Sequence, residues 1–194
     1  MSRNAETTRK TYETEIIVSV DLDGSGSADI NTGLGFLDHM LDALTRHSGF
    51  DLSVRATGDT QIDDHHTIED CAIVIGRAID EALGDRVGIA RFGSAYAPLD
   101  ESLSRAVVDL SGRPWPEIHI PFQREKVGEV ATENIVHFLR SLAIETRMAL
   151  HVDLIRGDND HHKAESAFKA VAQALREAVS VRGGDTPSTK GTLG

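Results

Sequence analysis

The chain has 194 residues, 40% of them hydrophobic and only 5% aromatic, so aliphatic side chains must fill the core of one domain or of two small halves. The formal net charge of −11 argues against a nucleic-acid partner, because a phosphate backbone demands clustered Lys and Arg. The single cysteine, Cys71, excludes an intrachain disulfide and fits a reducing compartment. A polar start without the apolar core of a signal peptide, and the lack of any apolar run near ~20 residues, predict a soluble cytoplasmic protein that does not span a membrane.

The first half of the chain predicts a strand, a helix, a second strand and a second helix. Residues 11–20 have strand composition and end in the turn-rich stretch DLDGSGSAD. Residues 36–50 place apolar side chains at helical spacing, with Gly49 as a stop. Residues 51–59 alternate as a strand, and residues 65–84 follow as a helix.

The second half of the chain repeats this order. Residues 104–112 and 115–122 predict two strands of a hairpin that turns around Gly112. A helix, a strand and a helix are then predicted over residues 132–147, 148–158 and 161–179. The repeated order indicates an internal duplication.

The stretches DDHHTIED and DNDHHKAE support the duplication, since each has an adjacent histidine pair followed by a glutamate, about half a chain length apart. We predict an α/β fold of the α+β type with duplicated halves, 1–90 and 91–182, and a tail, 183–194. Each half contributes one β-sheet, and a four-helix layer between the sheets buries the apolar helix faces. The tail is rich in Gly, Ser and Thr and is predicted to be flexible on its own.

The histidine pairs are the strongest functional signal. His65 and Glu69 are four positions apart and therefore share one face of the predicted helix. His66 is rotated by ~100° from His65 around the helix axis. Two neighbouring histidines on one helix therefore cannot easily grip the same ion, and each pair suits two ions.

The second copy, with one histidine from an earlier helix in each half, completes a set of metal ligands. The residues that join the first copy are His161, His162, Glu165, His39 and His137. Together they allow two sites of three imidazoles and one carboxylate, which leave open positions on a six-coordinate metal for catalysis. Taken alone, His39 or His137 is more simply a solvated surface histidine. The repeated spacing favours metal binding for the duplicated set.

Other polar residues are weaker signals one by one. Four cations in or near turns or a helix each suggest solvated charges: Arg91, Arg113, Lys169 and Lys190. In an acidic protein they could together form an anion pocket with the hydroxyl of Ser188. Glu15 is by itself an outward-facing carboxylate of a strand. Cys71 lies in the apolar run CAIVIG and is predicted to be a core residue, not a nucleophile.

Nine stretches of the chain, in this order, resemble those of the imidazoleglycerol-phosphate dehydratases, enzymes of histidine biosynthesis. They are ETEI, DLDGSG, GFLDHML, DDHHTIED, GIARFG, PLDE, DLSGRP, GDNDHHKAESAFKA and PSTKG. The resemblance covers nearly the whole chain and shows no departure at the motif positions. It implies a duplicated, ribosomal-S5-domain-2-like fold with helices between two sheets, in agreement with the prediction from the residues.

The resemblance also implies a cofactor, two Mn²⁺ ions per active site. By position, the ligands of the first ion are His65, Glu69, His137 and His161. Those of the second ion are His39, His66, His162 and Glu165. Each ion thus takes one member of each histidine pair. Members of the family form homo-oligomers of 24 subunits, with ligands drawn from neighbouring chains.

The substrate that the resemblance implies is D-erythro-imidazoleglycerol phosphate, which yields imidazole-acetol phosphate plus water. The proton to be removed from carbon is not acidic, so metals beside the imidazole would stabilise its anion, which expels a hydroxyl through a diazafulvene-like intermediate. Glu15 matches the family's catalytic carboxylate, with a general acid/base role. The implied phosphate contacts are Arg91, Arg113, Lys169, Ser188 and Lys190, with His47 beside them.

Three other functions compete with a metal-dependent carbon–oxygen lyase. A metal-storage assembly would use the histidine motifs but would need neither Glu15 nor the basic tail. A metal-dependent phosphohydrolase would explain the cations but would release phosphate. An RNA-binding module disagrees with the charge of −11. The ligand types alone leave the metal open, since Zn²⁺, Fe²⁺ and Co²⁺ also bind imidazoles and carboxylates.

Overall fold

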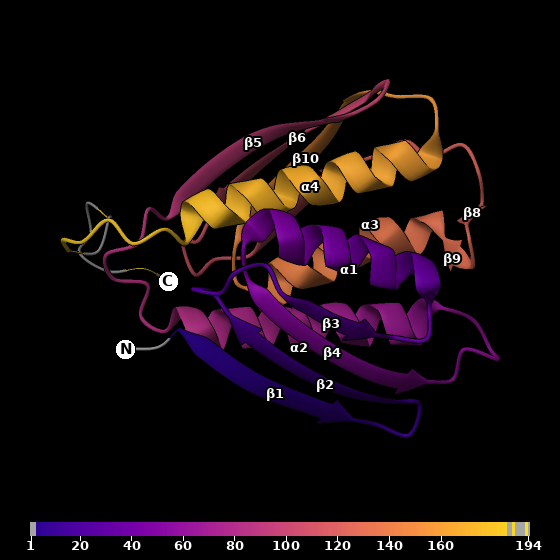
Figure 1. Cartoon of the computed structure of the whole chain (residues 1–194), viewed down its shortest axis with the longest axis horizontal. Helices are drawn as coiled ribbons and strands as arrows, with labels where there is room; N and C mark the ends of the chain where they lie inside the picture. The colour runs from indigo at the N-terminus through magenta and orange to yellow at the C-terminus, as the bar shows by residue number, and fades with distance from the viewer. Residues whose placement is uncertain (1–2, 186–187, 189–192, 194) are drawn as a thin grey trace.

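The computed structural model describes residues 3–185, 188 and 193. In this part of the chain two four-stranded sheets lie on either side of a layer of four helices (Figure 1). The elements of the first half are β1 (Asn4–Lys10), β2 (Thr14–Asp21), β3 (Ala28–Asn31), α1 (Gly35–Ser48), β4 (Asp51–Gly58) and α2 (His65–Leu83). Those of the second half are β5 (Phe92–Leu99), β6 (Ser102–Asp109), β7 (Trp115–His119), β8 (Lys126–Val127), β9 (Val130–Ala131), α3 (Thr132–Glu145), β10 (Ala149–Arg156) and α4 (Asp160–Ala178).

Both large sheets have the same topology. Their strand orders are β1-β2-β4-β3 and β5-β6-β10-β7, with equivalent strands in equivalent places. In each sheet the last pair, β3 with β4 or β7 with β10, is parallel, and the other pairs are antiparallel. The predicted duplication and fold class are therefore confirmed. The β8–β9 hairpin is an addition to the second half, and the divisions at residues 90 and 182 stay predictions.

The predicted hairpin around Gly112 is wrong. β10 lies between β6 and β7, antiparallel to the first and parallel to the second. The segment between β6 and β7 crosses the end of β10, and the N–H of Trp115 donates to the carbonyl of Met148 over 3.0 Å. Turn-forming residues mark a change of direction, but long-range packing decides which strand becomes the neighbour.

The edge strands β1, β3 and β5 were not predicted, and β3 begins within the stretch DLDGSGSAD, which was interpreted as a turn. The side chains of β1 alternate between exposed and half-buried positions, so its sequence, NAETTRK, lacks the apolar face by which a strand is found. β5 has two buried positions, Gly93, which has no side chain, and Ala97, which has only a methyl group. An edge strand covered on one face by a closely packed helix leaves little hydrophobic signal.

The core lies between each sheet and the helix layer. Ile16, Val18 and Val20 of β2 are buried, and the residues between them point to the outer face of the sheet. Cys71 is fully buried in α2, as predicted for a core residue. Burial raises the pKa of its thiol, which suits a packed side chain and not a nucleophile.

The helices of the described part of the chain all begin at the same end of the layer, on the right of Figure 1. α2 and α4 begin with the two histidine pairs, so the duplication brings both pairs to this end. Within the layer α2 packs against α3 and α1 against α4. Each helix pair therefore joins one helix from each half, and a site that bridges a pair needs both halves.

A close approach at Gly76 fixes the α2–α3 pair. A Cβ at this position would lie 2.7 Å from the Cβ of Glu145 and 3.0 Å from the carbonyl oxygen of Leu142. A methyl group would therefore push the two helices apart. The glycine allows the close packing that brings the side chains of α2 and α3 within reach of one another.

We expect Gly76→Ala to lower the free energy of unfolding by about 1 kcal/mol. Alanine gains ~1 kcal/mol of helix propensity, but overpacking of a core typically costs about 1–3 kcal/mol, so the steric cost prevails. For a chain of this size the loss corresponds to a Tm about 2–4 °C lower, measured by far-ultraviolet circular dichroism. The exposed Glu81 on the same helix gives the control, since Glu81→Ala should stay within ~0.5 kcal/mol. An equal or higher Tm for Gly76→Ala would contradict the close packing.

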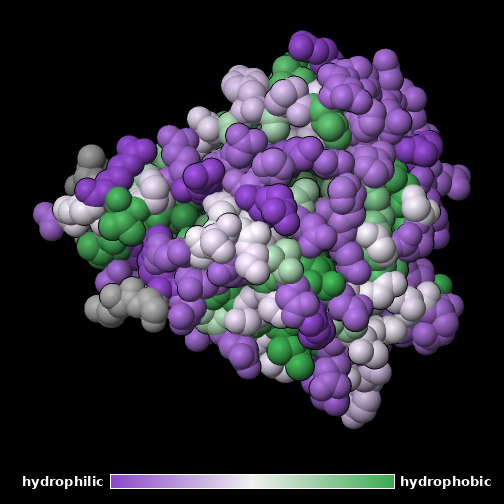
Figure 2. Space-filling view, viewed as in Figure 1, coloured by the Kyte–Doolittle hydropathy of each residue, from purple (hydrophilic) through white to green (hydrophobic). Residues whose placement is uncertain are grey.

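The face shown in Figure 2 is mainly hydrophilic, with apolar side chains scattered over it. This agrees with the large excess of acidic residues in the sequence. None of the helices in the described residues combines the length and the apolarity that a membrane crossing requires.

Candidate metal centre

The first triad, which we define as His65, Glu69 and His137, bridges α2 and α3. Nε2 of His137 lies 2.8 Å from Oε1 of Glu69, and the rings of His65 and His137 stack at 4.9 Å between centroids. His65 and Glu69 are on one face of α2 because they are four positions apart. The α2–α3 contact supplies the third member.

Asn134 orients the ring of His65. The Asn134 side chain is 4% exposed, and its Oδ1 lies 2.9 Å from Nδ1 of His65. An amide oxygen can only accept a hydrogen bond, so Nδ1 carries the proton and Nε2 presents its lone pair. Metal-binding histidines are commonly held in this way by a second hydrogen bond.

The second triad, which we define as His39, His161 and Glu165, bridges α1 and α4. Oε2 of Glu165 lies 3.1 Å from Nε2 of His39 and 3.2 Å from Nε2 of His161. Two imidazole nitrogens thus converge on one carboxylate oxygen. The ring of Phe36 packs edge-on against His161 at 5.2 Å, which limits the rotation of that ring.

Lys169 binds the other oxygen of Glu165, with Nζ 2.6 Å from Oε1. Burial alone would raise the pKa of Glu165, but the hydrogen bonds from Lys169 and His39 outweigh burial and lower this pKa to about 2. His47 lies nearby, and burial together with the charge of Lys169 lowers its pKa. The second triad therefore contains an ionised carboxylate, the protonation state that a metal requires of this ligand.

His66 and His162, the outer histidines, lie outside both triads. Nδ1 of His66 lies 3.0 Å from Oδ2 of Asp59, and this hydrogen bond raises the pKa of His66. Nδ1 of His162 lies 2.7 Å from Oε2 of Glu101. Each outer ring is turned away from the preceding histidine, at 73° between the planes of His65 and His66 and 88° in the second pair. The two members of each pair thus face different surroundings, as their spacing predicted.

The triads have the chemistry of a site for a divalent transition metal. Among the described residues, three groups of histidines and carboxylates have possible ligand atoms within 4.8 Å of one another. Two of them are the triads, and the third joins Glu13, Asp59 and His66. Two nitrogens and one oxygen from rigid helices, with an orienting hydrogen bond to His65, suit such an ion.

The family model described as imidazoleglycerol-phosphate dehydratase matches residues 32–175, a span that contains both triads. The chain belongs to the imidazoleglycerol-phosphate dehydratase family. The family and the fold predicted from the sequence motifs are thereby confirmed.

Named members of the imidazoleglycerol-phosphate dehydratase family match nearly the whole chain. The protein of that name from Phytophthora nicotianae is 56% identical over 192 residues, which are 98% of this chain and 42% of that longer protein. The one from Cereibacter sphaeroides is 54% identical over 194 residues, 98% of this chain and 100% of that protein. The crystal structure of the Staphylococcus aureus enzyme superposes with a TM-score of 0.83 at 41% identity, over 92% of this chain and 99% of that chain.

Within one chain, the structure groups the predicted ligands of this dehydratase family differently from the predicted sets. The first triad contains three of the four ligands expected for the first ion. The fourth, His161, lies with His39 and Glu165, because His161 and Glu165 are four positions apart on α4. His66 and His162 lie near carboxylates of other segments. Ligand sets that include neighbouring chains stay a prediction.

The residues that match the family's acid/base and phosphate positions are more dispersed. Glu15 lies on the outer face of β2, half exposed, with Oε2 2.7 Å from Nζ of Lys10. Arg91 binds Asp109 through two hydrogen bonds of 2.7 and 3.0 Å. Arg113 is exposed between β6 and β7.

Three further residues were predicted to contact the phosphate, and the structure describes two of them. Lys169 is the one placed beside a triad. Ser188 is described and half-buried, and Lys190 lies outside the described residues. The predicted phosphate pocket therefore stays a prediction.

Sequence reasoning missed Asn134, Asp59 and Glu101. Asp59 directly follows β4 and Glu101 lies in the turn between β5 and β6, where polar residues are common and carry no periodic signal. Glu101 lies in the stretch PLDE, which matches a family motif, and this was the available signal. The N–H of Asn159 and the ring of His162 hold the pKa of Glu101 well below its usual range.

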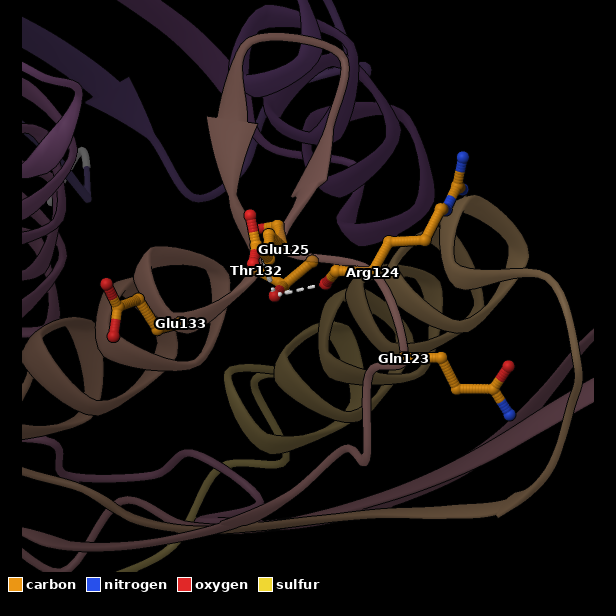
Figure 3. A pocket seen from close by; sticks show the side chains of 5 residues that line it. All are labelled: Gln123, Arg124, Glu125, Thr132 and Glu133. Atoms are coloured by element: carbon orange, nitrogen blue, oxygen red, sulfur yellow. Dashed lines mark hydrogen bonds between the residues drawn. The ribbon is translucent and has the colours of Figure 1, made fainter.

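A pocket of about 360 Å³ lies beside the β8–β9 hairpin, at the start of α3 (Figure 3). It is lined by Gln123, Arg124, Glu125, Thr132 and Glu133, none of them a predicted site residue. Oδ2 of the buried Asp160 accepts the N–H groups of Gln123 and Arg124 at 2.9 and 2.7 Å. These hydrogen bonds hold two residues of the pocket wall against the start of α4, next to the second triad.

Proposed function

We propose that the chain is a carbon–oxygen hydro-lyase that converts D-erythro-imidazoleglycerol phosphate to imidazole-acetol phosphate plus water in histidine biosynthesis. The observation that carries this proposal is the pair of triads, which place the same donors at equivalent sites of both halves. A single exposed histidine–carboxylate pair is a weak ion pair. Two triads, each built from two helices, are the arrangement that metal-assisted chemistry needs.

The cofactor of this proposal is a pair of Mn²⁺ ions, one at each triad. When bound, the ions act as Lewis acids that stabilise the anionic imidazole ring of the substrate. The triads hold nitrogen and oxygen donors on rigid helices, and Asn134 and Phe36 fix two of the rings. Imidazole and carboxylate donors also suit Zn²⁺, Fe²⁺ and Co²⁺, so the choice of Mn²⁺ rests on the family resemblance.

Each triad supplies three ligands, and we assign the further ligand to an outer histidine of a neighbouring copy. His162 would complete the first triad and His66 the second, so that each ion takes one member of each pair. The motif-based sets assigned His161 to the first ion and His162 to the second. We instead assign His162 to the first ion and His161 to the second. The contacts of His161 with His39 and Glu165 support this assignment.

Glu15 is the residue that we propose for proton transfer at carbon. Its carboxylate is exposed on β2, so it can reach a site completed by another copy. A carboxylate can accept the carbon-bound proton and return it to the enol on the way to the ketone. The route through an imidazolate and a diazafulvene-like intermediate belongs to this proposal.

The phosphate group is assigned to the cations that match the family motifs. They are Arg91, Arg113, Lys169 and Lys190, with the hydroxyl of Ser188 and with His47 beside them. Guanidinium and ammonium groups bind phosphate through charge-assisted hydrogen bonds. Arg91 is held by Asp109 within the chain, which fixes the direction of its guanidinium group.

Removal of the metal by EDTA is expected to lower the particle mass. We propose a homo-oligomer of 24 subunits in the cytoplasm, in which ions bound between copies hold the copies together. Light scattering before and after chelation measures the mass, and addition of Mn²⁺ should restore it. An unchanged mass after elemental analysis shows complete metal loss would contradict ligation between chains.

The function is tested by incubation with imidazoleglycerol phosphate and Mn²⁺. Formation of the ketone without release of inorganic phosphate is the expected result. Phosphate release would indicate a phosphohydrolase instead. Tight Mn²⁺ binding with neither product would leave metal storage as the function.

A further inference from the structure

The outer histidines are held in the same manner in both halves. His66 presents Nδ1 to Asp59, at 3.0 Å from Oδ2, and His162 presents Nδ1 to Glu101, at 2.7 Å from Oε2. The two carboxylates come from different places in their halves, since Asp59 follows β4 and Glu101 precedes β6. Unrelated positions thus supply the same contact to the same ring atom.

Both carboxylates are fixed acceptors. The side chain of Asp59 is only 12% exposed. Oε1 of Glu101 accepts hydrogen bonds from the N–H groups of Asn159 at 2.9 Å and Asp158 at 3.2 Å. The remaining oxygen, Oε2, faces His162. Backbone N–H groups thus order Glu101 independently of the histidine, and the low exposure of Asp59 limits its movement, so each carboxylate can impose an orientation on its ring.

A carboxylate acceptor selects one tautomer of a neutral imidazole. The proton stays on Nδ1, and the lone pair is then on Nε2, at the opposite edge of the ring. For His162, Nε2 lies 4.0 Å from Oδ2 of Asp100, beyond hydrogen-bonding distance. The outer histidines therefore present Nε2 as a possible ligand away from the carboxylate that holds Nδ1.

We propose that Asp59 and Glu101 are positioning residues that hold His66 and His162 in the Nδ1–H tautomer and direct Nε2 to metal ions bound by the triads of neighbouring copies. This inference rests on the proposed function, in which the outer histidines complete those triads. Carboxylate–histidine–metal arrangements raise the basicity of the ligand and fix its ring. The two carboxylates thus set the tautomer and the ring orientation of each outer histidine before the subunits assemble.

A separate metal site at Glu13, Asp59 and His66 is the competing interpretation, since their possible ligand atoms lie close together. Glu13 lies 3.8 Å from Nδ1 of His66, and its side chain is 57% exposed, so it is not held against the ring. In the other half, backbone N–H groups occupy Oε1 of Glu101, which suits an acceptor of a ring proton. The role common to both halves is orientation of the histidine.

The test compares Asp59→Asn and Glu101→Gln with wild type, all as full-length protein. Each amide keeps the size of the side chain but removes its charge and can either accept from Nδ1 or donate to it, so the selection of the Nδ1–H tautomer and the added basicity of the ring are lost. We expect Mn²⁺ affinity about 10- to 100-fold weaker in each variant, measured as free Mn²⁺ by electron paramagnetic resonance during titration. Turnover should recover when Mn²⁺ is raised to saturation.

The control is a third histidine–carboxylate pair of similar length. Glu117 lies 2.7 Å from Nε2 of His119 on the outer face of β7, away from the helix layer. Glu117→Gln should bind Mn²⁺ as wild type does. The Tm of each metal-free variant, compared with metal-free wild type, reports any general loss of folding. If one variant fails to fold, the other still tests the inference, because the two acceptors lie in different halves.

Unchanged Mn²⁺ affinity in a folded variant would overturn the positioning role. So would weaker affinity that comes with an equally large fall in the Tm of the metal-free protein. Loss of Mn²⁺ binding in Asp59→Asn alone, with Glu101→Gln as wild type, would favour the separate site at Glu13. If wild type itself binds no Mn²⁺ or forms no ketone, the proposed function fails, and this outcome is distinct from the other three.

Discussion

Glu15→Gln is expected to lower kcat by at least ~10²-fold while KM and metal content stay close to those of wild type. General acid/base groups contribute about 10²- to 10⁴-fold to rates, and the amide keeps the shape of the carboxylate but cannot take up the proton. Glu15 lies on the outer face of β2, so the substitution leaves the core intact. Steady-state kinetics with saturating Mn²⁺ measures the change.

Two variants of β1 separate this role of Glu15 from general effects on the sheet. Glu6 is an exposed carboxylate on β1, opposite Ser19 of β2, and Glu6→Gln should leave turnover unchanged. Lys10→Ala removes the ion-pair partner of Glu15 and should have a smaller effect than loss of the carboxylate itself. Near-normal turnover in Glu15→Gln would remove this residue from the mechanism.

His137→Ala is expected to remove one of the two ions and to reduce kcat by ~10³-fold or more. The substitution deletes the member of the first triad on α3, which leaves one imidazole and one carboxylate from this chain. A Lewis acid supplies several kcal/mol of transition-state stabilisation, and each ~1.4 kcal/mol corresponds to a tenfold change in rate. Elemental analysis should show a fall from about two ions per chain to about one.

His151→Ala provides the matched control for His137→Ala. His151 is exposed on β10, in register with Val107 and Glu117 on the neighbouring strands, so it is part of the outer face of the sheet. This variant should keep both ions and normal turnover. Full metal content and turnover in His137→Ala would refute the assignment of His137 to a metal site.

The helices could be predicted closely because each has a long apolar stripe and clear ends. The helix predicted over residues 65–84 is α2, His65–Leu83, and the one predicted over 161–179 is α4, Asp160–Ala178. Gly49, predicted as a stop, follows α1 with a φ of 80°, a conformation that glycine adopts without strain. Local periodicity and end signals were sufficient for these elements.

The strand order and the orienting side chains could not be predicted from local pattern. The position of β10 between β6 and β7 depends on pairing with strands that come before α3 in the chain, far from β10 in the sequence. Asn134 and Glu101 are found only when the folded chain places them beside a histidine. The four-residue spacing of His161 and Glu165, in contrast, was visible in the sequence and indicated the second triad more directly than the motif-based sets.

The helices of the two halves pack against each other in the way that two subunits pack in a dimer with two-fold symmetry. α2 packs on α3, and their counterparts α4 and α1 pack on each other in the same way. In a symmetric dimer, element i meets element j and j meets i, so the chain is built like two copies joined end to end.

A half by itself would contain no triad, and joining the copies allowed the two triads to diverge. Where the first triad has Asn134 and Ile73, the second has Phe36 and Lys169 at the matching positions, so one triad has a polar neighbour and the other has an aromatic ring and a cation.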